Sequence, residues 1–333
     1  MTENDKNKSA EMVAMAEKVR RGDRRALARA ITQAESLRKD HQEQAQHLLT
    51  ELLPDTGKSI RIGISGTPGV GKSTFIEAFG RHLTGMGHKV AVLTIDPSSK
   101  RTGGSILGDK TRMEELSRDP NAFIRPSPSG GSLGGVARRT REVMLLCEAA
   151  GYDVILIETV GVGQSETTVA DMVDIFMLLL APAGGDELQG IKRGVMELAD
   201  LIVINKADGD LIPVAKRAAN EYRGAVGLMR PKSKLWTPKV LMTSALKKIG
   251  IAELWDTINE YREARDAEGE LQAQRADQAA AWMWSEIDDS LMNHLRDHPV
   301  VATMLPEKEV AVKAGNTSPT AAARELLAVF LGK

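Results

Sequence analysis

The stretch that decides the fold of this chain is Gly66-Thr67-Pro68-Gly69-Val70-Gly71-Lys72-Ser73-Thr74. It matches the phosphate-loop pattern G-x-x-x-x-G-K-[ST], in which glycines let successive backbone N–H groups turn toward a phosphate. An apolar run, Ile60–Ser65, enters the loop, and a helical pattern leaves it near Lys72. This strand–loop–helix order is the one that a phosphate site needs, so the stretch predicts a nucleotide-binding α/β domain.

The residue types in the loop predict how it contacts a nucleotide. The loop backbone surrounds the phosphates, Lys72 brings a positive charge to the β- and γ-phosphates, and the Ser73 hydroxyl binds Mg²⁺. A dinucleotide fingerprint of the G-x-G-x-x-G type is excluded, because Gly69 and Gly71 would require a third glycine where Thr74 stands. A plain glycine turn would not explain the Lys72-Ser73 pair.

Short apolar runs alternate with helical patterns along the middle of the chain. Several of the runs, such as Val154–Ile157 and Leu201–Ile204, are continuously apolar, which is typical of strands covered on both faces of a parallel sheet. We therefore expect an α/β fold with a doubly wound, mostly parallel sheet. The expected strands are Ile60–Ser65, Lys89–Asp96, Ala122–Pro126, Tyr152–Thr159, Asp174–Ala181, Leu201–Asn205 and Val240–Thr243, and the expected helices lie near Lys72–Thr84, Val136–Ala150, Gly190–Ala199 and Pro213–Leu228.

Helical patterns flank this nucleotide domain, which we place at residues 58–265. Residues 1–57 are charged, alanine-rich and free of proline before Pro54, so we expect an N-terminal helical extension. In the C-terminal segment, 266–333, apolar residues recur at alternating spacings of three and four, as in a coiled-coil seam. This helix either docks on its own domain or forms the interface of a homodimer. The seam residues are Ala273, Ala276, Ala280, Trp284, Ile287, Leu291 and Leu295.

The tetrapeptide Asn205-Lys206-Ala207-Asp208, directly after a predicted strand, indicates which base is bound. Asp208 can accept hydrogen bonds from N1–H and the 2-amino group of guanine, two donors that adenine lacks. Asn205 would tie the base loop together, and the stem of Lys206 would lie along the base ring. Ser244-Ala245-Leu246 follows the last predicted strand, where the Ala245 N–H would contact the base oxygen. Turn formers are common at strand ends, but this order along the chain favours GTP or GDP.

Three carboxylates are candidates for binding Mg²⁺ and for acting on the reacting water. Asp96 and Glu158 each close a predicted strand, at the carboxyl edge where ligands collect, and Asp109 lies in a glycine-rich loop. Each could instead be a helix cap or a turn residue. Gly161 would give its N–H to the γ-phosphate, whereas Val162 stands where many GTPases place a water-orienting glutamine. We therefore expect slow intrinsic hydrolysis.

Composition excludes several other classes of protein. Cys147 is the single cysteine, so neither a disulfide nor a cysteine-based metal cluster can form within the chain. The net charge of −1 gives no electrostatic footprint for nucleic acid. The first eight residues contain no apolar signal segment, and the run Ile175–Gly185 is too short to span a bilayer. We expect a cytoplasmic protein that binds neither nucleic acid nor membrane.

Whole segments of the chain resemble the MeaB family, GTPases associated with methylmalonyl-CoA mutase and formerly grouped as ArgK-type transport kinases. The switch segment Glu158-Thr-Val-Gly-Val-Gly-Gln-Ser-Glu166 is more diagnostic than the phosphate loop, which all relatives share. The resemblance implies a homodimeric G protein that uses GTP to gate the loading of adenosylcobalamin into the mutase and to protect the mutase from inactivation. The other matching segments are Gly66–Thr74, Asp96–Ser99, Gly103–Arg112, Arg125–Ser129 and Leu180–Lys192.

The loop Ala183–Arg193 follows a predicted buried strand and contains three glycines and four charged residues. It is either a flexible connector or, because its strand ends on the same sheet edge as Lys72 and Glu158, a third switch. In the second case Lys192 would offset charge in the transition state, as an arginine finger does.

A small-molecule kinase is the alternative function, with arginine or ornithine as the acceptor, as the older family label implies. Such a kinase needs an acceptor pocket and a base, and the sequence offers carboxylates but no separate substrate domain. A nickel-inserting GTPase would require a cysteine–histidine cluster, which a single cysteine does not provide.

Overall fold

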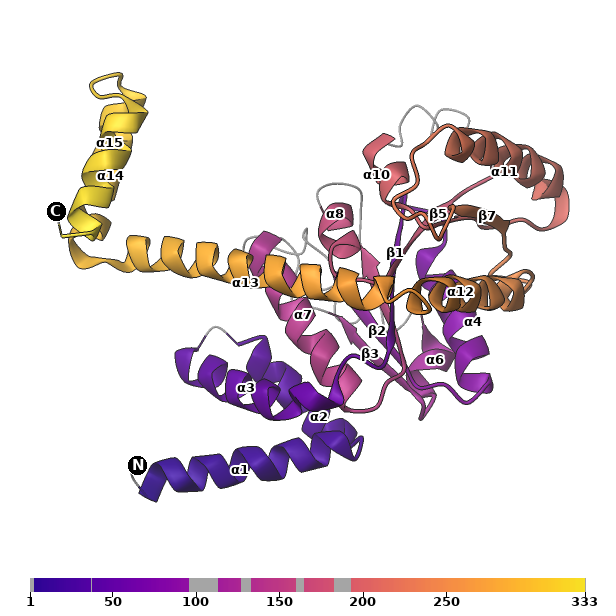
Figure 1. Cartoon of the computed structure of the whole chain (residues 1–333), viewed down its shortest axis with the longest axis horizontal. Coiled ribbons are helices and arrows are strands. Elements are labelled where there is room, and N and C mark those ends of the chain that lie inside the picture. The colour runs from indigo at the N-terminus through magenta and orange to yellow at the C-terminus, as the bar shows by residue number, and fades with distance from the viewer. Residues whose placement is uncertain are drawn as a thin grey trace. The chain divides into compact units, whose positions relative to one another are not determined.

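The computed structural model describes residues 3–36, 38–95, 113–126, 133–159, 165–182 and 193–332. The chain forms two compact units, Met1–Ala276 and Asp277–Lys333. The first unit contains the sheet and the helices that surround it (Figure 1).

The first unit is built on a seven-stranded sheet in which every neighbouring pair of strands is parallel. β1 lies at its centre, and the order across the sheet is β3-β2-β4-β1-β5-β6-β7. This topology confirms the predicted doubly wound α/β fold. The strands are β1 (Ile60–Gly66), β2 (Val90–Ile95), β3 (Ala122–Pro126), β4 (Val154–Thr159), β5 (Ile175–Leu180), β6 (Leu201–Ile204) and β7 (Lys239–Met242).

Helices cover both faces of this sheet, which is why its strands are apolar at successive positions. On one face, Ile64 of β1 packs in a cluster with Phe79 of α4, and Phe79 contacts Trp255 of α12 with 6.2 Å between ring centroids. α8 packs on the opposite face, where a Cβ added to Gly63 would lie 2.8 Å from Val169. The helices around the sheet are α4 (Lys72–Gly85), α6 (Glu114–Arg118), α7 (Leu133–Ala149), α8 (Ser165–Ala170), α10 (Arg193–Leu198), α11 (Ile212–Gly227) and α12 (Ile251–Asp266).

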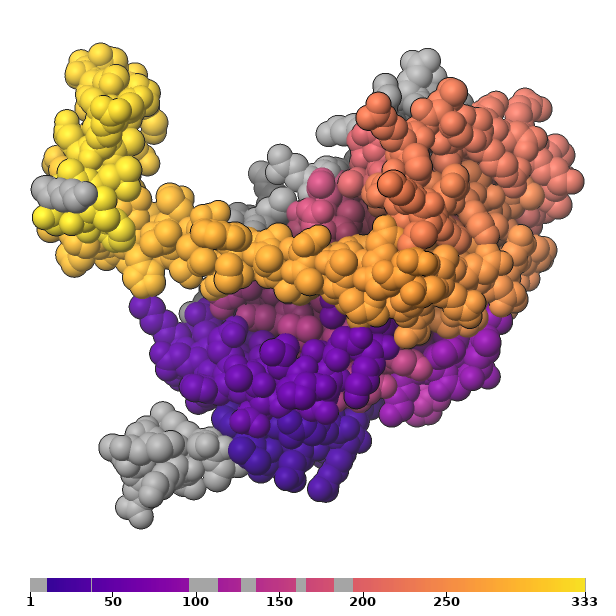
Figure 2. All heavy atoms as spheres, in the orientation of Figure 1, coloured from indigo at the N-terminus to yellow at the C-terminus, as the bar shows by residue number. Residues whose placement is uncertain are grey.

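Three N-terminal helices pack together and against α7: α1 (Glu3–Arg20), α2 (Arg24–Ala34) and α3 (Lys39–Leu52). Residues 11–52 of this group are indigo to purple in Figure 2. Polar contacts join them to the nucleotide domain. Glu35, directly after α2, pairs with Arg125 of β3, and Gln46 donates to Glu142 of α7 over 2.6 Å. Burial raises the pKa of Glu35, and the charge of Arg125 acts against that rise. The N-terminal helices are therefore attached to the edge strand of the sheet by charge as well as by apolar packing.

An aspartate stands directly before each of three strands and closes the amino edge of the sheet. Asp153, Asp174 and Asp200 precede β4, β5 and β6. Each carboxylate accepts a backbone N–H at or near the start of the neighbouring strand. Asp153 accepts the Lys89 N–H over 2.7 Å, Asp174 accepts the Arg61 N–H over 2.8 Å, and Asp200 accepts the Phe176 N–H over 2.8 Å. Each also lies beside a basic side chain from another part of the chain. The shortest nitrogen–oxygen distances are 2.9 Å for Asp153 and His88, 2.6 Å for Asp174 and Arg275, and 3.0 Å for Asp200 and Lys232.

The C-terminal segment contains three helices joined by short non-helical connections: α13 (Glu270–Asp297), α14 (Pro299–Lys313) and α15 (Pro319–Phe330). In the second unit α14 and α15 pack together, with His298 and Phe330 in ring contact at 5.9 Å. On α13, the seam residues Trp284, Ile287 and Leu291 are 61%, 36% and 55% exposed. None of the described helices is both long enough and apolar enough to cross a membrane.

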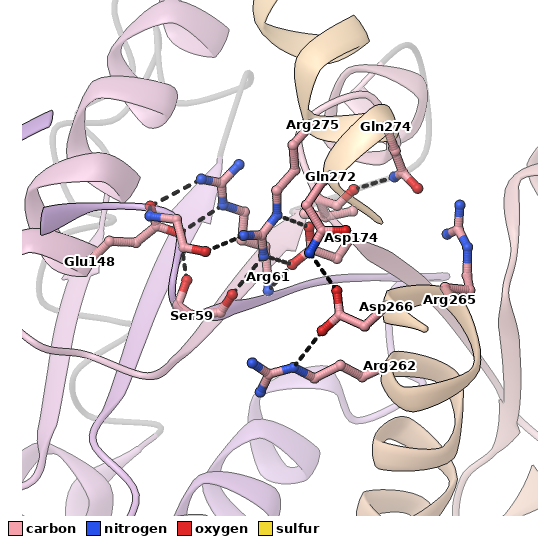
Figure 3. Close-up of polar contacts among 12 residues, drawn as sticks. Ser59, Arg61, Glu148, Asp174, Arg262, Arg265, Asp266, Gln272, Gln274 and Arg275 are labelled. Atoms are coloured by element: carbon pink, nitrogen blue, oxygen red, sulfur yellow. Dashed lines mark hydrogen bonds and ion pairs between the residues drawn. The ribbon is translucent and has the colours of Figure 1, made fainter. Parts of the chain in front are cut away.

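Arg275, on the first turns of α13, joins three segments of the first unit (Figure 3). Its guanidinium forms a bidentate pair with Asp174, with Nε–Oδ1 and Nη2–Oδ2 distances of 2.7 and 2.6 Å, and donates to the Ser59 carbonyl over 2.6 Å. Arg61, whose N–H binds the same aspartate, pairs through its side chain with Glu148 of α7 at 2.8 Å. One network of charges therefore holds the linker before β1, the start of β5 and the start of α13.

Replacing Arg275 should destabilise the first unit strongly. Arg275→Gln would leave the Asp174 carboxylate, which is only 1% exposed, without its cation. Breaking a buried pair in this way is expected to cost about 3 kcal/mol in the free energy of unfolding, measured by denaturant titration. The control is Arg262→Gln, because Arg262 is 45% exposed and lies 3.7 Å from Asp266. The control should change the free energy by less than about 1 kcal/mol. Equal effects of the two variants would show that the network contributes no special stability.

Candidate nucleotide-binding site

The phosphate loop connects β1 to α4 at the carboxyl edge of the sheet. Gly66 passes so close to β5 that an added Cβ would lie 2.4 Å from the Leu179 carbonyl oxygen. Gly71 has a φ of 92°, in the left-handed region, and forms the N-cap of α4. Both positions therefore require glycine. The first N–H groups of α4 have no partner within the helix, which makes them suitable donors to a phosphate.

Lys72 folds back onto the loop from which it starts. Its Nζ donates to the carbonyl oxygens of Gly66 and Thr67 over 2.6 and 3.3 Å. Burial lowers the pKa of Lys72, and the negative charges of Glu158 and Glu166 act in the opposite direction by favouring the ammonium form. The lysine is thus held beside the loop by weak acceptors that phosphate oxygens could replace.

Glu158 lies near the end of β4, with Ile64 of β1 and Thr94 of β2 as its register partners on either side. Its side chain is almost fully enclosed, at 3% exposure. Ser73, the second residue of α4, carries a partly buried hydroxyl beside Lys72. A carboxylate and a hydroxyl are hard oxygen donors of the kind that Mg²⁺ takes in nucleotide sites, so the described residues fit that ion.

Asn205 joins three loops at the end of β6. Its side-chain amide donates to the Val70 carbonyl of the phosphate loop over 3.0 Å. Its oxygen accepts the Ala245 N–H over 3.2 Å and the Thr243 hydroxyl over 3.4 Å. Because Asn205 is 1% exposed, these contacts are shielded from water. Asn205 therefore holds the phosphate loop and both predicted base loops together.

The other residues predicted to contact the base lie around this junction. Lys206 has a φ of 59° and its Nζ donates to the Gly69 carbonyl over 2.7 Å. The Asp208 carboxylate accepts a hydrogen bond from the Ser244 hydroxyl. Leu246 is 73% exposed. The Ala245 N–H, which was expected to contact the base oxygen, donates to Asn205 here, so that base contact stays a prediction.

Four predicted site residues lie outside the described part of the chain: Asp96, Asp109, Gly161 and Lys192. Glu166 is a candidate that the sequence analysis did not assign. It is 2% exposed at the start of α8, and its charge reaches Lys72. The sequence signal that could have identified Glu166 is its place in the segment Glu158–Glu166, which is diagnostic of the family.

A family model described as "Methylmalonyl Co-A mutase-associated GTPase MeaB" matches residues 27–300 of the chain. The chain belongs to the MeaB family. The predicted resemblance is confirmed, and with it the expectation that this MeaB-family chain is a GTP-binding GTPase.

Individual relatives agree with the MeaB assignment. A "Putative GTPase" of Caulobacter vibrioides is 60% identical over 309 residues, which cover 93% of this chain and 94% of that protein. The "Methylmalonic aciduria type A homolog, mitochondrial" of Mus musculus is 53% identical over 320 residues, covering 93% of this chain and 77% of that protein. A crystal structure titled "LAO/AO transport system kinase" has a TM-score of 0.77 and 41% identity, and the match covers 100% of this chain and 99% of that one.

Removing the Asn205 side chain should disorganise the nucleotide site of this MeaB-family protein. Asn205→Ala leaves the Val70 carbonyl and the Ala245 N–H without their partner. We expect a loss of about 1–3 kcal/mol in unfolding free energy and a fall in GDP affinity of at least about tenfold. Thermal unfolding and titration calorimetry measure the two effects. The control is Asn220→Ala, at an exposed asparagine that accepts from Arg223 over 2.8 Å, and it should leave both values unchanged.

Proposed function

We propose that the chain is a cytoplasmic, GTP-dependent chaperone of an adenosylcobalamin-dependent methylmalonyl-CoA mutase. It would use GTP to gate cofactor loading and to protect the mutase from inactivation. The match to the mutase-associated family over residues 27–300 carries the choice of partner. The junction at Asn205 supports a guanine site, because it holds the phosphate loop and the loops of Asp208 and Ala245 together.

In this proposal each described residue of the site has a separate task. The loop from Gly66 to Thr74 and Lys72 bind the phosphates, Lys72 by exchanging its carbonyl acceptors for phosphate oxygens. Asp208 would recognise guanine. Glu158 and Ser73 would hold Mg²⁺, together with Asp96 and Asp109 as candidates from the sequence alone. The three carboxylates are also the candidates for acting on the reacting water. Mg²⁺, when bound, would neutralise charge on the β- and γ-phosphate oxygens.

The mutase should accelerate GTP turnover, and Lys192 is our candidate for that effect. Purified mutase added to the protein should raise the rate of phosphate release from GTP, which is slow without it. Lys192→Ala should keep GTP affinity and basal turnover but lose the acceleration, because a cation brought to the phosphates offsets transition-state charge. No acceleration of the unsubstituted protein would contradict the proposed chaperone role. Full acceleration of the variant would contradict only the role of Lys192.

A transport kinase is the second candidate, because the solved structure with 41% identity bears that name. The two functions differ in where the γ-phosphate goes. With γ-labelled GTP and arginine or ornithine present, a kinase would transfer label to the amino acid, whereas a GTPase would release it only as free phosphate.

Recognition of guanine should depend on Asp208. Asp208→Asn replaces one of the two carboxylate oxygens that would accept from guanine by an amide N–H donor, and it should lower GTP affinity by at least about a hundredfold, with little gain for ATP. Xanthosine triphosphate, which carries an oxygen in place of the 2-amino group, should bind the variant better than GTP does. Titration calorimetry of the three nucleotides measures this. Unchanged GTP affinity in the variant would rule out the guanine role of Asp208.

We propose that the chain forms a homodimer through the exposed seam residues of α13, Trp284, Ile287 and Leu291. Leu271 and Arg275 belong to the first unit, where Leu271 is 4% exposed, so a truncation that tests the dimer must retain them. A chain ending at Ala276 should be a monomer by light scattering and should still bind GTP. Trp284→Ala in the full chain should weaken the dimer by about 2 kcal/mol or more, since large aromatic side chains dominate interfaces. A truncated protein that stays dimeric would place the interface elsewhere.

A further inference from the structure

Thr94 carries a buried hydroxyl that the described residues leave without a hydrogen bond. The residue is 1% exposed, and its Oγ1 has no partner. The other buried threonines among the described residues all use their hydroxyls as donors: Thr84, Thr140, Thr159, Thr243 and Thr257. A buried unpaired hydroxyl is costly and uncommon, so its presence at one position requires a reason.

The position of Thr94 gives that reason. It is the next-to-last residue of β2, and its register partner on β4 is Glu158. Side chains of paired residues on adjacent parallel strands point to the same face, with strands about 4.8 Å apart. Val92 and Leu156, two residues earlier on each strand, belong to the core cluster that includes Phe75 of α4. Thr94 and Glu158 therefore both lie on the α4 face of the sheet, at its carboxyl edge.

This placement puts a free donor beside a carboxylate of the candidate site. α4 begins with Lys72, whose ammonium form is favoured by the charge of Glu158, so the face in question is the one that meets the phosphate loop. A threonine hydroxyl can donate to a carboxylate, whereas the apolar neighbours on this face cannot. A donor of this kind fixes which way a metal-binding carboxylate points.

We infer that Thr94 is a positioning residue, whose hydroxyl donates to the Glu158 carboxylate in the nucleotide-bound state and orients it for Mg²⁺ and the reacting water. This inference rests on the proposed function of Glu158. It gives the unpaired Thr94 hydroxyl a partner on the neighbouring strand. Thr94 touches neither nucleotide nor water itself.

The test compares Thr94→Val with Thr94→Ser. A non-hydrolysable GTP analogue is titrated by calorimetry with Mg²⁺ and with EDTA. In Thr94→Val, which keeps the shape but removes the hydroxyl, the gain in affinity that Mg²⁺ provides should fall at least about tenfold, and turnover should fall similarly. Affinity in EDTA should be unchanged, and Thr94→Ser should behave like the unsubstituted protein. The melting temperature without nucleotide should not fall, because the lost hydroxyl had no partner.

A purely structural threonine would give the opposite pattern, a lower melting temperature with an unchanged Mg²⁺ effect, and that result overturns the inference. If Thr94→Val does not fold, Thr94→Ala is compared with Thr94→Ser, and an equal Mg²⁺ effect in the two overturns it. The matched control is Thr257→Val on α12, whose hydroxyl donates within its own helix over 2.8 Å. It should leave the Mg²⁺ effect unaltered.

Glu158→Gln separates this inference from the function on which it rests. If Glu158→Gln loses the Mg²⁺ effect while Thr94→Val keeps it, only the role of Thr94 is overturned. If Glu158→Gln keeps the Mg²⁺ effect, the proposed role of Glu158 fails and the inference fails with it.

Discussion

The structure depends on one constraint: in a parallel sheet buried on both faces, hydrogen bonds between strands satisfy the backbone along the strands, and the polar groups at the two ends of the strands need other partners. At the amino ends of the strands, charged side chains of the protein itself provide these partners. Asp153, Asp174 and Asp200 accept the first N–H groups of neighbouring strands, and each is matched by a basic side chain brought from elsewhere in the chain. These three aspartates therefore have their partners within the chain.

The carboxyl edge is left for a ligand. Lys72 binds carbonyls of its own loop, Glu158 is buried and its negative charge acts on Lys72, and Thr94 has a hydroxyl with no partner among the described residues. Asn205 is the exception, since its amide nitrogen and its amide oxygen both form hydrogen bonds that join the loops. At the carboxyl edge, Asn205 thus fixes the loops, while Lys72 and Glu158 are groups that would suit phosphate oxygens and a cation. A nucleotide-binding switch requires both features.

Local sequence patterns predicted the sheet well, because a doubly covered strand is apolar at most of its positions and a phosphate loop has a fixed spacing of glycines. The helix Glu114–Arg118 was missed, since five residues are too few to show a period, although Leu116 is fully buried. Thr94 was read as part of a strand, because a β-branched residue suits a strand whether or not its hydroxyl is paired. Such partnerships depend on the register of distant strands, which no local pattern contains.

Helix α13 shows most clearly that the spacing of apolar residues does not predict which part of a helix is buried. Its seam keeps spacings of three and four throughout, and Trp284 on that seam is 61% exposed, whereas Leu271, two residues before the first seam residue, is 4% exposed. Arg275, which local sequence would assign to a solvated face, pairs with an aspartate 101 residues earlier in the chain. Periodicity states which side chains share a face of a helix, and tertiary contacts decide what covers each part of it. The first turns of α13 are held by the charges that close the sheet, so an interface with a second subunit would have to be sought on the residues after Ala276.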